Sequence, residues 1–228
     1  MAAPVAKLVV NQPSRSAERV PASRRRDRIL EATVATIARF GLSRTTMERV
    51  AVAAKVSPGT VTFHFASKEA LLLAALDHLA VEFDSARRGA LVAVGDDPVR
   101  ALLALIEVNF DPVISDRRKI AVWYAFWGEA RARQEYMRRC GELDRQHSDQ
   151  QVELFRRVIT TGGHVHLDAE AGAFGLVGLM EGLWEDLLVE GRRFDRGRAK
   201  WLCRTYLTGL FPEELRRANV GGAEGGRT

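Results

Sequence analysis

The chain of 228 residues has little of what marks several common protein classes. It has only two cysteines, Cys140 and Cys203, each beside an arginine in a segment of helical pattern. Cysteines in such a setting predict neither a disulfide framework nor a metal knuckle, and we expect both to be reduced. His164-Val-His166 resembles a metal-binding pair, but no cysteine or third histidine lies close to it in sequence. We therefore predict a loop there and no metal site.

Long hydrophobic runs are also missing. The longest near the N-terminus is Leu8-Val9-Val10, which is too short for a signal peptide, and no stretch is long enough to span a membrane. We expect a cytoplasmic protein without membrane contact. A glycine-rich phosphate loop, a nucleophile elbow and paired carboxylates at a turn are missing as well, so we predict neither enzymatic activity nor a cofactor.

Also absent is the two-residue alternation of apolar and polar residues that marks a half-buried strand. Helical patterns between short breakers predict an all-α fold, and 46% hydrophobic residues suffice for a sizeable core. The two ends, 1–21 and 219–228, lack periodicity and are predicted to be disordered. The expected helices span residues 23–40, 46–54, 58–64, 68–93, 97–110, 116–133, 135–160, 168–190 and 195–211.

Residues 44–69 carry the strongest local signal, because they encode two short helices joined by a tight turn. Thr45 and Glu48 have the spacing of a capping box, which predicts a helix starting near Thr46. One face of that helix is apolar, at the helical spacing of Met47, Val50, Ala51 and Ala54.

Ser57 is placed to cap the next helix, and Pro58 occupies its first position, where a missing N–H costs nothing. Ser67 is placed to cap a third helix. Two helices at this spacing, the second short and exposed, are typical of a helix-turn-helix. An ordinary helical hairpin within a bundle has the same periodicity and remains an alternative.

Charge favours the DNA-binding alternative. Residues 1–68 hold 12 Lys and Arg against 4 Asp and Glu, whereas residues 69–228 hold 22 against 25. The first segment is thus +8 and the second −3, although the whole chain is +5. Lys and Arg beside the predicted turn can neutralise DNA phosphates and release their counterions, which favours DNA binding.

The segment VSPGTVTFHFASKEALL resembles the signature of TetR-type repressors, and residues 24–69 carry this resemblance. It implies a recognition helix from Pro58 to His64 that enters the major groove, with phosphate contacts from the helix starts. Thr62 and Phe63 stand where many members of that family have Tyr, so neither phenol hydroxyl is available here. The predicted DNA-binding residues are Arg24, Arg26, Thr45, Thr46, Ser57, Pro58, Gly59, Thr60, Thr62, Phe63, His64 and Lys68.

The resemblance implies a helix-turn-helix domain at 22–67 and a helical effector-binding and dimerisation domain at 68–218, without a flexible linker. Four glycines spaced 3, 3 and 4 leave one face of helix 168–190 nearly bare: Gly172, Gly175, Gly178 and Gly182. An operator with two half-sites requires two helix-turn-helix domains, so we predict a homodimer. Its interface would be formed by helices 168–190 and 195–211 and completed by Leu202, Tyr206 and Leu210. A close contact within one chain is the alternative use of such a face. For Arg24 to Arg26, the alternative is a solvated helix start.

All four tryptophans follow residue 120, and Trp123 and Trp127 lie four apart on one helical face. Aromatic faces attract cations, and quaternary ammonium cages are built in this way. Residues 106–127 and 179–184 resemble the sensor domain of choline-responsive repressors of glycine betaine synthesis within the TetR family, which implies choline or another quaternary ammonium as effector. The predicted ligand-binding residues are Phe110, Trp123, Trp127, Trp184, Glu129 and Glu181.

Three alternatives remain open. The aromatic stripe can be plain core. A repressor of the same architecture can respond to a hydrophobic or acyl ligand. A nonspecific DNA-binding protein without effector would show a steep salt dependence but little operator preference.

Overall fold

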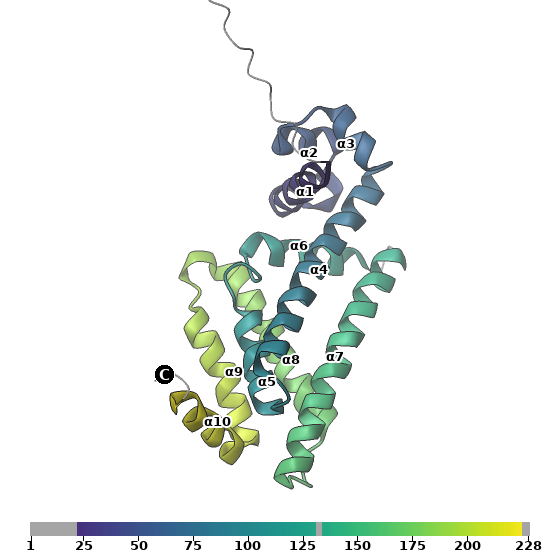
Figure 1. Ribbon diagram of the computed structural model, residues 1–228. Coiled ribbons are helices and arrows are strands. Elements are labelled where there is room, and N and C mark those ends of the chain that lie inside the picture. The colour runs from purple at the N-terminus through teal and green to yellow at the C-terminus, as the bar shows by residue number, and fades with distance from the viewer. Residues whose placement is uncertain (1–21, 131–133, 225–228) are drawn as a thin grey trace, which may run out of the picture.

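A computed structural model describes residues 22–130 and 134–224, which hold ten α-helices and one 3-10 turn and no strand (Figure 1). This confirms the predicted all-α fold. The elements are α1 (Ala22–Arg44), α2 (Met47–Ala54), α3 (Pro58–His64), α4 (Lys68–Val94), α5 (Pro98–Asn109), α6 (Arg117–Ala130), α7 (Gln134–Gly162), α8 (Ala169–Glu190), η1 (Gly191–Arg193), α9 (Arg196–Leu210) and α10 (Pro212–Glu224).

The helix ends follow from local chemistry. Gly41 takes a positive φ of 77° and kinks α1 directly after residue 40, where the predicted first helix ends. Lys55 ends α2 in the left-handed region at φ 53°. The hydroxyls of Ser57 and Ser67 accept the backbone N–H groups of the third residue beyond them, as predicted for the starts of α3 and α4.

The capping box at Thr45 is a wrong prediction by one residue. Thr46 is the N-cap of α2, and its hydroxyl accepts the Arg49 N–H at 3.3 Å. Thr45 is fully buried instead, and its hydroxyl donates to the Gly41 carbonyl at 2.8 Å. The kink at Gly41 frees that carbonyl and turns Thr45 inward, which residue spacing alone does not reveal.

Two hydrophobic clusters make up the interior, and α6 joins them. One cluster unites α1, α2, α3 and the first half of α4 with α6 and the start of α7, through the fully buried Val122, Phe126 and Tyr136. The other fills the bundle of α5, α7, α8, α9 and α10. Figure 1 shows α6 lying between the α1–α3 unit and that bundle. Trp123 packs against both clusters.

The last helix, α10, was not predicted. Pro212 starts it, because proline is tolerated in a first helical turn, and buried Phe211 and Leu215 anchor it to the bundle. Residues 219–224, which belong to the segment 219–228 that was expected to be disordered, lie in α10. The predicted tail 1–21 and residues 225–228 lie outside the described residues.

His164 and Glu214 hold α10 to the end of α7, with 2.9 Å between the His164 Nε2 and Glu214 Oε1 atoms. Burial raises the pKa of Glu214, but the hydrogen bonds from His164 and the backbone, together with the charges of His164 and Arg217, lower it further than burial raises it. Among the described residues, no helix is long and apolar enough to cross a bilayer, and no group of three or more potential ligands could hold a metal ion.

Candidate DNA-binding and effector-binding sites

Helix α3 is docked by one face and free on the other. Val61 and Phe65 are buried in the cluster that α1 and α2 share with α4, which fixes the orientation of α3. Thr62 is exposed, and Phe63 is 84% exposed although it is a large apolar side chain. Thr62 and Phe63 therefore lie on the free face of a firmly held helix, where they are open to another molecule.

The exposed face of α3 is ordered by short hydrogen bonds. The Ser57 and Thr60 hydroxyls lie 2.8 Å apart, and the Ser57 hydroxyl also accepts the Thr60 N–H at 3.2 Å. Thr62 donates to the Pro58 carbonyl at 3.2 Å, and the Phe63 ring meets His64 edge to face at 5.3 Å. These contacts limit side-chain motion, so less entropy is lost when a groove is bound.

Gly59 lies on the same face, and nothing inside the protein requires a glycine there. A Cβ atom added at Gly59 would meet only the Ser57 Oγ atom, at 3.9 Å. Its φ is not in the left-handed region, so any residue could adopt its backbone conformation. The open space above Gly59 is therefore available to a partner that approaches the backbone closely.

The predicted basic residues differ in their surroundings. Arg24 and Arg26 are exposed, and the Arg26 guanidinium lies over the Phe65 ring, 5.4 Å from its centroid. Lys68 donates to the Ser43 carbonyl at 2.8 Å, which ties the start of α4 to the end of α1. Thr45, being buried, does not present its side chain to this surface.

Aromatic residues of α6 form a second candidate site. The Trp123 and Trp127 ring centroids lie 6.4 Å apart, and Tyr124 meets Trp127 edge to face at 5.2 Å. The Tyr124 hydroxyl donates to the Glu181 carbonyl on α8 at 3.1 Å. Burial raises the pKa of Tyr124, and the charges of Glu185 and Glu181 raise it further. The Tyr124 ring, which contacts Trp127, therefore lies within the negative potential of two α8 carboxylates.

The other predicted ligand-binding aromatics lie in the core of the bundle. Phe110 is fully buried, stacked near Phe194 at 6.4 Å, and Trp184 is 7% exposed with its indole N–H donated to the Asn109 carbonyl at 2.9 Å. The structure thus brings Trp123 and Trp127 together, and joins Trp184 to the residue before Phe110. Glu129 is half-buried on α6, and Glu181 is exposed.

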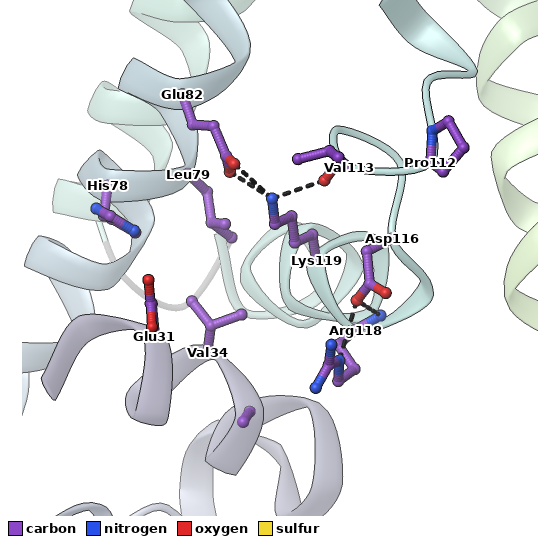
Figure 2. A pocket seen from close by; sticks show the side chains of 11 residues that line it. Glu31, Val34, His78, Leu79, Glu82, Pro112, Val113, Asp116, Arg118 and Lys119 are labelled. Atoms are coloured by element: carbon purple, nitrogen blue, oxygen red, sulfur yellow. Dashed lines mark hydrogen bonds and ion pairs between the residues drawn. The ribbon is translucent and has the colours of Figure 1, made fainter. Parts of the chain in front are cut away.

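A pocket of about 370 Å³ lies where α1 meets α4 and the loop before α6 (Figure 2). Lys119 closes one side of it, because its ammonium donates at 2.6 Å to both Glu82 oxygens and to the Val113 carbonyl. Glu31 of α1 and His78 of α4 also line it. None of the six predicted ligand-binding residues lines this pocket. The ion pair of Lys119 with Glu82 links α6 to α4 at the junction of the two clusters.

The glycine face of α8 is divided between two uses. A Cβ atom at Gly172 would collide with Phe155 and one at Gly175 with Tyr206, so these two glycines serve contacts within the chain. Nothing lies within 4 Å of a Cβ at Gly178 or Gly182, and both are exposed.

The apolar residues predicted for the seam are partly buried, whereas other apolar side chains of α8 and α9 are exposed. Leu202, Tyr206 and Leu210 pack against the bundle core. Phe174 of α8 and Trp201 of α9 are instead 80% and 60% exposed. The helical spacing of these residues predicts an apolar stripe on α9, but it does not indicate that the stripe packs against the core of the same chain.

Comparison with known proteins shows the family to which this chain belongs. Residues 29–75 match the TetR family of bacterial regulatory proteins, and residues 98–212 match the C-terminal domain of BetI-type transcriptional repressors. The chain belongs to the TetR family of transcriptional regulators and is not an enzyme. Its C-terminal domain is of the BetI type, so it is a BetI-like helix-turn-helix repressor.

Relatives cover most of the chain. The regulator BetI 2 of Chromohalobacter salexigens is 30% identical over 82% of this chain and 88% of its own, and BetI of Pseudomonas paraeruginosa is 31% identical over 80% and 91%. A solved regulator of Pseudomonas aeruginosa PAO1 superimposes with a TM-score of 0.74 at 26% identity, covering 91% of this chain and 99% of its own. A regulator from Saccharomonospora viridis, solved in complex with choline, gives a TM-score of 0.70 at 22% identity over 81% and 96%.

Proposed function

We propose that the protein is a ligand-responsive repressor that binds a pseudo-palindromic operator as a homodimer. The observation that carries this proposal is the exposed face of α3, with Gly59, Thr62 and Phe63 open to a partner on a helix held by buried Val61 and Phe65. Two such helices would enter successive major grooves about 34 Å apart. The proposed division is a DNA-binding domain at 22–67 and an effector-binding and dimerisation domain at 68–218, acting in the cytoplasm.

The dimer seam that we propose runs along α8 and α9. Gly178 and Gly182 allow a second helix to approach closely, and Phe174 and Trp201 offer apolar area that the chain itself leaves uncovered. A symmetric dimer would bury both copies of this surface at once. Tryptophan is also among the residues that most often dominate interface energies, which favours a central position for Trp201.

The proposed effector is choline or another quaternary ammonium compound. The BetI-type match of residues 98–212 supports it, as does the related regulator that was solved with choline. Trp123, Tyr124 and Trp127 supply ring faces, and Glu181 and Glu185 supply negative potential nearby. A quaternary ammonium gains about 0.5 to 2 kcal/mol from each well-placed ring.

Coupling between the two sites would pass through α6. This helix carries the three rings, shares the DNA-binding domain's core through Val122 and Phe126, and is tied to α4 by the ion pair of Lys119 with Glu82. A ligand held against the rings therefore biases the element on which α1 packs. An effector with a coupling energy of about 1 to 3 kcal/mol would weaken operator binding about 5- to 150-fold.

The experiment that tests the effector site is Trp127→Leu, measured by calorimetry with choline and by anisotropy on operator DNA. Loss of one ring should weaken choline binding about 2- to 30-fold and leave affinity for the operator unchanged. The control is Val165→Ala, at a 95% exposed site outside α6 and the proposed dimer seam, which should leave the affinity for choline unchanged. Unchanged choline binding by the Trp127 variant would show that this ring is core or surface and not part of the effector site.

A further inference from the structure

A cluster of buried polar groups in the bundle has no role in the function proposed above. Arg87 of α4 is only 4% exposed and Gln151 of α7 only 2% exposed. The Arg87 Nε and Gln151 Nε2 atoms have no hydrogen-bond partner among the described residues, and Nε2 of half-buried His147 has only a long contact of 3.5 Å with the Asp84 Oδ1 atom. His147 and Gln151 lie four residues apart, so they share one face of α7.

The charge of Arg87 is the feature that most needs an explanation. Its guanidinium donates once, to the Gln150 Oε1 atom at 3.2 Å, and lies 5.7 Å from the centroid of the Phe83 ring. No carboxylate in the described part of the chain forms an ion pair with it. Asp84 is the carboxylate whose charge raises the pKa of Arg87. It forms an ion pair with Arg88, and its Oδ1 atom lies 3.5 Å from the His147 Nε2 atom.

Burial of this kind is costly. Burial lowers the pKa of Arg87 to about 10, only partly offset by Asp84, so the side chain is still a cation at neutral pH. Burial also lowers the pKa of His147, and the charge of Arg87 lowers it further, so His147 is neutral there. A buried cation without a counter-ion destabilises a fold, and such sites are kept where binding requires them.

Aromatic rings flank the same groups. Phe83 contacts His147 at 5.4 Å and Trp184 at 5.8 Å between ring centroids. A groove of about 520 Å³ between α4 and α7 is lined by Asp84 and Gln146, which lie beside this cluster.

We propose that Arg87, Gln151 and His147 bind the carboxylate of a small effector whose remaining part lies against Phe83 and Trp184. Arg87 would donate Nε–H, Gln151 its amide N–H groups, and His147 the proton of Nε2, and a carboxylate accepts all of these. The effector is then an organic anion or a zwitterion, and a zwitterion with a quaternary ammonium head group would satisfy both this site and the rings of α6. This inference rests on the proposed function as a ligand-responsive repressor, and it narrows the class of ligand.

The test is calorimetry of the full-length protein with three probes: choline, glycine betaine, which carries a carboxylate on the same head group, and hexanoate, which lacks the head group. We expect at least one of the two carboxylates to bind. Arg87→Met and Gln151→Met should each weaken that binding at least 10-fold. The control, Arg156→Met, removes an arginine of α7 that is 55% exposed and should leave all affinities unchanged.

The three probes separate this inference from the function on which it rests. If choline alone binds, the quaternary ammonium proposal stands and this inference is wrong. If a carboxylate binds and choline does not, this inference stands and choline is excluded as effector. If no probe binds, or if both methionine variants keep full affinity for the carboxylate, the inference is overturned.

Thermal unfolding without ligand distinguishes a binding role of Arg87 from a structural one. Removing an unpaired buried charge should leave the melting temperature of Arg87→Met unchanged or raise it. A marked decrease would mean that Arg87 stabilises the bundle, which contradicts the inference. The Gln151 variant tests the same site without altering its charge, so the binding result does not depend on the stability of a single variant.

Discussion

Gly59→Ala should separate folding from DNA binding. The new methyl group would meet only the Ser57 Oγ atom, at 3.9 Å, and alanine favours a helix over glycine by at most about 0.5 to 1 kcal/mol. The free energy of unfolding should therefore stay the same or rise. On DNA, the methyl group would occupy space that a close approach of α3 to the groove requires.

The cost on DNA is that of about one good groove contact, roughly 1 to 3 kcal/mol, which corresponds to about 5- to 150-fold weaker binding. Urea unfolding gives the stability, and fluorescence anisotropy at fixed salt gives the affinity for DNA from upstream of the protein's own gene. The matched control is Gly89→Ala, because Gly89 is exposed on α4 with nothing within 4 Å of an added Cβ. Equal DNA affinity of the Gly59 variant and the wild type would refute a close approach of this face to DNA.

Three further predictions concern other parts of the chain. Phe63→Ala should change unfolding by less than about 0.5 kcal/mol, because Phe63 is 84% exposed, and yet weaken operator binding in the same anisotropy assay. Trp201→Glu should give monomers in sedimentation at micromolar concentration and should bind the operator less tightly. The control Val165→Glu, at a 95% exposed site, should remain a dimer. If the Trp201→Glu variant is still a dimer, the seam lies elsewhere. Burial lowers the pKa of His147, so as the pH falls the unfolded state binds the proton before the folded state does, and the wild type loses stability below pH 6.5. In urea unfolding, His147→Gln should lose stability less steeply over this pH range, and equal slopes for the two proteins would contradict this.

The DNA-binding half of the molecule was largely predictable because its signals are local. Ser57, Pro58 and Ser67 act within one helical turn, and each starts the helix that its chemistry predicts. The error at Thr45 has a tertiary cause, since the kink at Gly41 turns that side chain into the core. A capping pattern read along the chain contains no information about such a kink.

The sensor half was less predictable because helical periodicity shows which residues share a face but not which other helix that face packs against. The aromatic stripe of α6 was visible in sequence, but Phe126 belongs to the DNA-binding domain's core and Trp123 to both clusters. Tyr206 was expected at the dimer seam, yet its hydroxyl donates to the Gly172 carbonyl at 3.0 Å within the chain. The burial of Arg87 left no signal, because one arginine in a charged helix looks like a solvated residue.

The measurement that tests the central claim most directly is anisotropy of the protein on DNA from upstream of its own gene, at fixed salt. Choline and its neutral carbon analogue are compared as effectors. The account predicts tight, sequence-dependent binding whose midpoint shifts with choline and not with the neutral analogue. Binding without operator preference, or a midpoint that ignores charge on the ligand, would contradict a repressor that senses a quaternary ammonium group.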